Sequence, residues 1–206
     1  MVLKAIEVFR EIEEGDIGFL SDLEEAQDRF KWIPEDRLNV ISPLPEQDVE
    51  YRLDRLNKFE LVERGIAKYP GYRILPSGYD LLSLWDLVQE GVLEAFGRAL
   101  GIGKEADIYD ALTPEDERVA VKFNRLGLSF QSVKKKRPYV PKHGGSDASK
   151  KSAKREFEAL KKVHTKVEVP RPVSRNRHVI VMGLIEGEEL ADVAEIDYPE
   201  PVLDEI

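Results

Sequence analysis

The chain has no cysteine among its 206 residues, which excludes disulfide bonds, thiolate metal sites and a cysteine nucleophile. Its longest apolar run, residues 179–185, is far too short to span a bilayer. The first residues lack the basic segment and long apolar core that mark a secretory signal. These absences predict a soluble cytoplasmic protein without a membrane segment. The hydrophobic content of 42% is sufficient for the cores of one large domain or two small ones.

Positive charge is concentrated in one stretch of an otherwise acidic chain. The formal net charge is −9, yet residues 122–166 hold 14 Lys and Arg against three Asp and Glu. This basic segment predicts a polyanionic partner, either nucleotide phosphates or RNA. A solvated helix face followed by a lysine-rich loop is the alternative. For RNA, the expected contacts come from the clustered cations Lys134, Lys135, Lys136, Arg137, Lys142, Lys150 and Lys151.

Helical and strand patterns in the first 92 residues follow the order of a winged helix-turn-helix domain. Apolar spacing predicts helices, and short β-like runs predict a two-stranded wing. Gly15 and Gly18 are interpreted as a break between the first two helices, and Ser21 as the cap of the second. The predicted elements are helices at 3–13, 21–30 and 46–58, wing strands at 61–64 and 72–75, and a last helix at 76–91.

The predicted recognition helix, residues 46–58, is a poor candidate for reading DNA. Residues 1–100 hold 12 basic and 21 acidic side chains, and acidic residues predominate in this helix. Duplex affinity comes mostly from neutralising phosphates, so sequence-specific DNA binding is disfavoured. A structural or protein-contact role is favoured for the winged helix, and contact with ribosomal RNA is the alternative.

The pattern changes near residue 93, which divides the chain into predicted domains at 1–92 and 93–206. Short β-like runs occur at 106–111, 119–123 and 179–182. A long amphipathic helix is predicted at 147–164, with Ala153, Phe157, Leu160 and Val163 facing inward. An antiparallel sheet with one helix between its third and fourth strands is the layout of a protein kinase N-lobe. The predicted fold class is therefore α+β.

Lys122 is the candidate for binding phosphate. It lies in an apolar strand on the same face as Ala120, and burying an unpaired ammonium is costly unless anions accompany it. Kinases supply those anions as ATP phosphates and a helix glutamate. Glu156 shares a helical face with Leu160 and is the predicted partner. The alternatives are a lysine that reaches water at a strand end and a glutamate that pairs locally with Lys151 or Lys154.

The segment Gly101-Ile-Gly-Lys104 precedes the first β-like pair of the second half. It is too short for a Walker A loop and lacks the third glycine of the usual kinase loop. Continued through Glu-Ala-Asp-Ile-Tyr109, it resembles the phosphate loop of RIO-family atypical kinases. Residues 126–139, 154–160 and 179–185 are similar to the flexible loop, αC helix and fifth strand with hinge of that family.

The preceding winged helix makes the chain resemble the second RIO subfamily, in an archaeal-like form. No counterpart of the family's His-Gly-Asp or Asp-Phe-Pro loops occurs before Ile206. We therefore expect a chain that ends before the catalytic lobe, as a fragment or a truncated gene product, and that is inactive alone. Asp192 and Asp197, in the acidic tail, are interpreted as part of the interlobe connection.

The resemblance implies an ATP- and Mg²⁺-dependent serine/threonine protein kinase or ATPase in small ribosomal subunit maturation, with the ribosomal precursor as partner. The metal ligands are expected beyond this chain. It implies that Lys122 holds phosphates, that Glu156 orients Lys122, and that Ser129 is an autophosphorylation position, an ordinary loop serine being the alternative. The implied ATP-binding residues are Gly101, Gly103, Lys104, Glu105, Ile108, Ala120, Lys122, Met182, Gly183 and Ile185. Among them, the Gly183 carbonyl and the Ile185 N–H are the implied adenine contacts.

Two other classes of function are weighed against the kinase. One is a catalytically silent module that binds pre-ribosomal RNA or protein, and the other is a winged-helix DNA-binding regulator. The basic segment lies outside the winged helix, which argues against the regulator.

Overall fold

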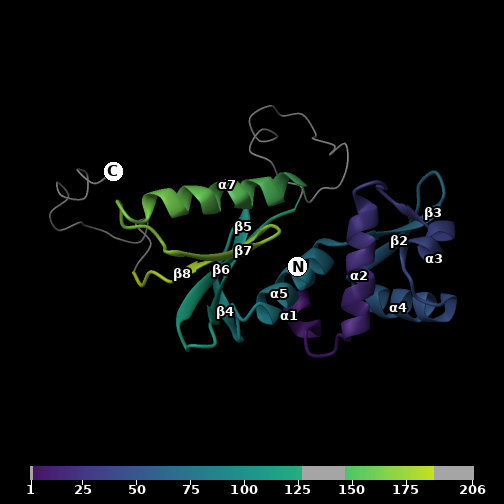
Figure 1. Ribbon diagram of the computed structural model, residues 1–206, viewed down its shortest axis with the longest axis horizontal. Helices are drawn as coiled ribbons and strands as arrows, with labels where there is room; N and C mark the ends of the chain where they lie inside the picture. The colour runs from purple at the N-terminus through teal and green to yellow at the C-terminus, as the bar shows by residue number, and fades with distance from the viewer. Residues whose placement is uncertain (1, 127–146, 188–206) are drawn as a thin grey trace.

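Two packed units follow one another along the chain, and the second is a sheet covered by one long helix (Figure 1). The computed structural model describes residues 2–126 and 147–187. Within these ranges, no helix is both long enough and apolar enough to cross a bilayer.

The first unit combines helices with a small antiparallel sheet in which β3 lies between β1 and β2. β2 and β3 form the predicted wing, and α4 is the predicted recognition helix. The elements are α1 (Val2–Val8), α2 (Glu14–Gln27), β1 (Ile33–Pro34), the 3₁₀ helix η1 (Glu35–Arg37), α3 (Leu38–Ile41), α4 (Glu46–Lys58), β2 (Val62–Ile66), β3 (Pro70–Ile74) and α5 (Pro76–Gln89).

The break predicted at Gly15 and Gly18 is wrong, because both glycines lie inside α2. This helix begins at Glu14. The Asp16 carboxylate, in its first turn, accepts a hydrogen bond from the Glu13 N–H at 3.0 Å. Ser21, the predicted cap, lies in mid-helix and donates its hydroxyl to the carbonyl four residues earlier. Packing of the apolar face of α2 outweighs the low helix propensity of the two glycines. The first helix is correspondingly shorter than predicted.

The second unit is an antiparallel sheet of strand order β4-β5-β6-β8-β7, and α7 crosses one of its faces (Figure 1). β4 and β7 were not among the predicted strands. Most side chains of β4 are exposed, and those of β7 are mostly polar, so neither shows the apolar alternation that identifies a strand. The elements are β4 (Ala95–Ile102), β5 (Ala106–Leu112), β6 (Arg118–Asn124), α7 (Asp147–Val163), β7 (Pro172–Asn176) and β8 (Val179–Gly183).

The central strand β6 presents different side chains to the two faces of the sheet. Val119, Val121 and Phe123 are buried on one face. Ala120 and Lys122 alternate with them and therefore lie on the other face, where Ala120 packs with residues of α7. One strand thus contributes to a core on one side and to a candidate site on the other.

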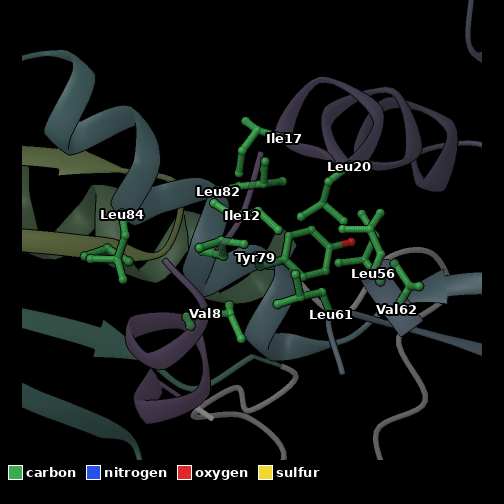
Figure 2. Packing of buried hydrophobic residues seen from close by; sticks show 14 of the residues in the cluster. Val8, Ile12, Ile17, Leu20, Leu56, Leu61, Val62, Tyr79, Leu82 and Leu84 are labelled. Carbon is green, nitrogen blue, oxygen red and sulfur yellow. The ribbon is translucent and has the colours of Figure 1, made fainter. Parts of the chain in front are cut away.

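The face of the sheet away from α7 packs into the core of the first unit. One continuous cluster of buried side chains includes Leu82 and Leu84 of α5 together with Tyr109, Phe123 and Val181 of the sheet. Figure 2 shows part of this cluster, where α1, α2 and α5 meet. Each large apolar side chain buried in this way contributes about 1.5–3 kcal/mol. Apolar packing therefore joins the winged helix to the back of the sheet.

Candidate functional site

Lys122 and Glu156 meet on the sheet face that α7 covers. Lys122 Nζ lies 2.5 Å from Glu156 Oε1, and this contact joins β6 to α7. The two side chains keep 23% and 33% of their area exposed, so the pair is accessible from one side. The glutamate pairs with the strand lysine and not with Lys151 or Lys154, its local alternatives. The contact has the geometry predicted from the sequence, and the roles of the two residues in binding nucleotide remain predictions.

The placement of Glu156 follows from the apolar face of α7. Ala153 and Phe157, four residues apart, are buried against the sheet, and Glu156 lies beside them on the edge of that face. Glu158 is exposed on the opposite side, 3.8 Å from Lys161. Val163 was predicted to face inward but is 38% exposed, because the helix ends at this residue beyond its packing against the sheet.

Apolar side chains lie next to the Lys122–Glu156 pair. Ala120 is opposite Met182 in the β6–β8 register, and Ile108 is opposite Lys122 in the β5–β6 register. These three apolar residues belong to one small cluster under α7, which also contains Leu184, a residue that was not predicted for the site. An apolar patch beside an ion pair suits a flat heteroaromatic ring joined to an anionic group.

The predicted phosphate loop forms the turn between β4 and β5. Gly101 pairs with Ile108, and Gly103 N–H donates to Ala106 C=O at 2.9 Å. A side chain at Gly103 would approach the Ala106 carbonyl to 3.0 Å, so this position favours glycine. Lys104 and Glu105 are exposed at the tip of the turn. The turn connects directly to the strand that carries Ile108, and thus to the apolar patch.

Arg125, which was not predicted for the site, ties this turn to α7. Its backbone N–H donates to Glu105 C=O at 2.8 Å, and its Nη2 donates to Asp107 Oδ1 at 2.8 Å. Its carbonyl accepts the Ser149 hydroxyl at 2.7 Å. Ser149 is in the first turns of α7, so one residue contacts both the turn and the helix. No pattern in the sequence identifies this contact, because it depends on where β6 ends.

β8, the strand that leads into the predicted hinge, ends at Gly183, whose N–H donates to Arg171 C=O at 2.8 Å. The predicted adenine contact at this residue uses its carbonyl, which this bond does not involve. Ile185 follows the strand and is 60% exposed.

Some predicted residues lie outside the described ranges: Ser129, Lys134, Lys135, Lys136, Arg137, Lys142, Asp192 and Asp197.

The arginines of α4 are turned toward α2 and away from solvent. Arg52 Nη1 and Arg55 Nη2 each lie 2.9 Å from the carboxylate of Asp16, whose side chain is fully buried. Burial alone would raise the pKa of Asp16, but hydrogen bonds from Arg55, Glu13 N–H and Arg52 hold it below its usual value. Both arginines are therefore engaged within the domain, and the exposed side of α4 keeps acidic residues such as Asp54.

Two family models match separate parts of the chain. The model described as "Rio2, N-terminal" matches residues 9–90, and the RIO domain model matches residues 107–206. The chain belongs to the RIO family, in its Rio2 branch. The RIO resemblance and the α+β fold, a winged helix followed by a kinase-like N-lobe, are thus confirmed.

Several relatives of this RIO chain are named Rio2 kinases. The RIO-type serine/threonine-protein kinase Rio2 of Methanocaldococcus jannaschii is 39% identical over 84% of this chain and 66% of its own length. The serine/threonine-protein kinase rio2 of Dictyostelium discoideum is 30% identical over 96% of this chain and 39% of its own. The chain therefore spans less than two thirds of these relatives.

A solved RIO structure has the same arrangement. The Rio2 kinase of Chaetomium thermophilum, described as an ADP/Mg²⁺-phosphoaspartate complex, superposes with a TM-score of 0.81 at 26% identity. The alignment covers 96% of this chain and 60% of the Chaetomium chain.

Proposed function

We propose that this chain supplies the nucleotide-binding half of a RIO-type serine/threonine protein kinase or ATPase, and that the protein acts in small ribosomal subunit maturation in the cytoplasm. The observation that carries the proposal is the Lys122–Glu156 pair, which lies beside an apolar patch and next to a glycine-containing turn. The named kinase relatives, one of them described with ADP and Mg²⁺, support the same function.

The chemistry of the site fits a nucleotide. The Lys122 ammonium neutralises phosphate charge, and the Glu156 carboxylate holds it beside the apolar patch. Gly101, Gly103, Lys104 and Glu105 form the phosphate turn. Phosphoryl transfer depends mainly on positioning and charge neutralisation, which these groups supply. Adenine is expected against the remaining apolar and hinge residues: Ile108, Ala120, Met182, the Gly183 carbonyl and the Ile185 N–H.

Magnesium, when bound with ATP, neutralises charge on the phosphates. Its protein ligands are expected in the catalytic lobe that RIO kinases possess, because the sequence of this chain contains no Asp-Phe-Pro loop. The chain's own contribution is therefore the lysine, its carboxylate partner and the backbone of the phosphate turn.

Nucleotide binding tests the proposal directly. The purified chain is expected to bind MgATP weakly in isothermal titration calorimetry, and Lys122→Ala is expected to lower the affinity about 10- to 100-fold, the value of one charge-assisted contact. Lys161→Ala is the matched control, since Lys161 is exposed on α7, where it pairs with Glu158 and lies over the Phe157 ring. Equal ATP affinity in the unmodified chain and Lys122→Ala would contradict the assignment of the lysine.

A second function, binding of pre-ribosomal RNA, is favoured by the outer surface of α7. Lys150 is not available for it, because its Nζ lies 2.8 Å from Glu24. Other cations remain exposed and line a shallow groove that includes Glu158 and Ala159. We propose that a phosphate backbone contacts this groove. The exposed cations of the groove are Lys151, Lys154, Arg155 and Lys162.

The salt dependence of RNA binding identifies the surface. We expect sequence-indifferent binding whose log–log salt slope becomes flatter by about two units in the double variant Lys154→Gln/Arg155→Gln, one unit per lost phosphate contact. Lys58→Gln/Lys68→Gln, on exposed positions of the winged helix, is the control and should leave the slope unchanged. An unchanged slope in the α7 variant, or preference for one duplex DNA sequence, would refute this second function.

A further inference from the structure

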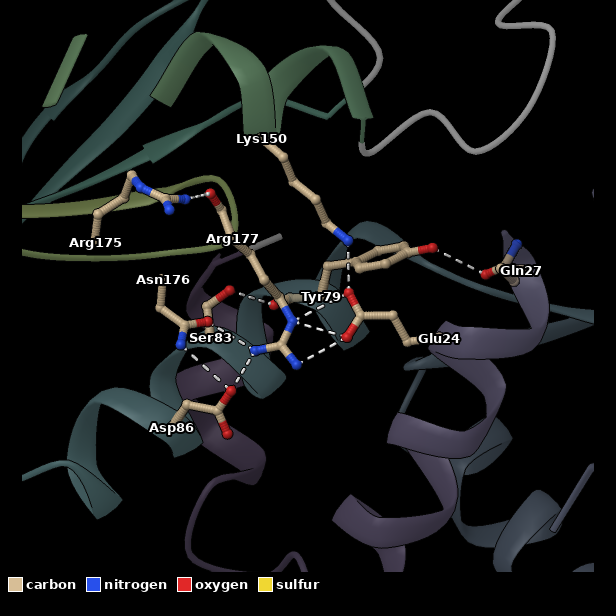
Figure 3. Close-up of polar contacts among 9 residues, drawn as sticks. All are labelled: Glu24, Gln27, Tyr79, Ser83, Asp86, Lys150, Arg175, Asn176 and Arg177. Atoms are coloured by element: carbon tan, nitrogen blue, oxygen red, sulfur yellow. Dashed lines mark hydrogen bonds and ion pairs between the residues drawn. The ribbon is translucent and has the colours of Figure 1, made fainter. Parts of the chain in front are cut away.

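A carboxylate of the winged helix lies at the junction between α2, α7 and the β7–β8 hairpin. Glu24, in the last turn of α2, accepts a hydrogen bond from Lys150 Nζ at 2.8 Å and from Arg177 Nε at 2.8 and 3.1 Å (Figure 3). Lys150 belongs to the first turn of α7, and Arg177 follows β7. One side chain therefore connects three elements that are distant in the sequence.

Glu24 and Arg177 are the more buried members of this junction, whereas Lys150 and Asp86 are more exposed. The side chains of Glu24 and Arg177 keep only 15% and 17% of their area exposed. Burial alone would raise the pKa of Glu24, but hydrogen bonds and charge from Arg177 and Lys150 hold it below its usual value. The carboxylate is thus ionised at neutral pH, and its contacts act in a partly desolvated environment where charge pairs are strong.

The backbone of Arg177 indicates that the hairpin is held in place. Asn176 pairs with Val179, so Arg177 and His178 form a two-residue loop, and Arg177 has a φ of +48°. A residue with a β-carbon costs about 1–2 kcal/mol in this conformation, which glycine adopts readily. The arginine side chain offsets this cost through Glu24 and through Asp86, whose Oδ2 lies 2.5 Å from Nη1.

The adjacent loop residue anchors the same hairpin. His178 Nε2 lies 2.8 Å from Asp80 Oδ1 of α5, and both side chains are buried. The hairpin is therefore fixed to the winged helix at two successive residues. Because β8 pairs with β6 along its whole length, the strand that carries Lys122 is fixed with it.

Glu24 thus contacts the helix that carries Glu156 and the hairpin whose strand β8 pairs with the strand of Lys122. Lys150 and Glu156 are six residues apart on α7, about 9 Å along the helix axis. In protein kinases, the position of this helix determines whether its glutamate meets the strand lysine. The tie at Lys150 restrains the helix at its N-terminal end, and the tie at Arg177 restrains the sheet beneath it.

We propose that Glu24 is a positioning residue of the nucleotide site, through which the winged helix holds α7 in the orientation that pairs Glu156 with Lys122. This inference rests on the proposed nucleotide-binding function and assigns the winged helix a part in it. Glu24 touches neither nucleotide nor the reacting atoms, and its effect is transmitted by Lys150 and α7.

A double-mutant cycle on MgATP affinity tests the inference. Glu24→Gln is expected to weaken binding about five- to tenfold in the unmodified chain, and to cause no further loss in a Glu156→Gln background. Glu25→Gln is the matched control, because Glu25 is the neighbouring residue on α2, carries the same charge and is exposed. It should leave affinity unchanged. Equal affinities for Glu24→Gln and the unmodified chain, or losses that add in the double variant, would overturn the proposal.

Two further measurements separate positioning from loss of stability. Amide hydrogen exchange in Glu24→Gln should rise in the first two turns of α7 and stay unchanged in β5 and β6; a rise across the sheet would instead mean general unfolding and would reject the inference. Lys150→Met removes the tie to α7 alone and should weaken MgATP binding as Glu24→Gln does, whereas Lys150→Arg should retain affinity. Absence of MgATP binding by the unmodified chain would refute the nucleotide function itself.

Discussion

Joined to the catalytic lobe of an archaeal Rio2 relative, residues 1–206 are expected to transfer phosphate from ATP, and Lys122→Ala is expected to lower that rate about 10²- to 10³-fold. One preorganised charge that stabilises phosphate in the transition state has this magnitude. Residues 1–206 alone are expected to show no turnover, because their sequence supplies no His-Gly-Asp base loop and no Asp-Phe-Pro metal loop. The measurement is release and transfer of radiolabelled phosphate, including transfer to Ser129.

Lys161→Ala in the joined protein is the control. Its rate should equal that of the unmodified joined protein, since Lys161 is exposed and contacts Glu158 and the Phe157 ring, neither of which is assigned to nucleotide binding. Turnover by residues 1–206 that disappears in Lys122→Ala would contradict the prediction. It would mean that another carboxylate of this chain, such as Asp192 or Asp197, acts as the base.

Asp16→Ala is expected to lower the free energy of unfolding of the winged helix by about 3–5 kcal/mol at pH 7. The buried Asp16 carboxylate pairs with Arg52 and Arg55. Its removal takes away the buried partner of both partly buried cations and leaves them the more exposed Glu13 carboxylate. Asp54→Ala is the control, because Asp54 is exposed on the same helix as the two arginines, and its effect should stay within about 0.5 kcal/mol. Urea unfolding followed by circular dichroism gives both values.

The contacts of Asp16 with the two arginines also predict how the free energy of unfolding depends on pH. The pKa of Asp16 is lower in the folded chain than its usual value of 3.8, so its stabilisation is fully present above that value and is lost as pH falls through the folded-state pKa. The stability difference between the unmodified chain and Asp16→Ala should therefore shrink below about pH 4. A difference that stays constant down to pH 2 would show that Asp16 contributes shape and not charge.

Sequence patterns predicted those parts of the site that depend on the repeat of apolar residues along a single helix or strand. The alternation around Lys122 and the helical spacing around Glu156 each define a face, and the kinase layout brings the two faces together. Their contact could therefore be predicted without coordinates, as could the wing. Val163 was misplaced because periodicity identifies a face but does not show where packing against the sheet ends.

Contacts between the two units could not be predicted in this way. Glu24 and Arg177 are 153 residues apart, and their pairing depends on how the winged helix docks against the sheet. In the sequence, Arg177 is one of many charged residues, and only its positive φ and its burial distinguish it. Arg125 was missed for a similar reason, since its three contacts depend on the end of β6. Local periodicity contains no information about either arrangement.

The apolar cluster shared by the two units limits which amino-acid substitutions can accumulate during evolution. A substitution at Phe123 or Val181 alters a surface on which both the sheet and α5 depend, so a compensating change has to arise in the other unit. Exchange of the winged helix for an unrelated one would expose this surface to water and favour self-association. The two units are therefore expected to stay together in one chain and to coevolve.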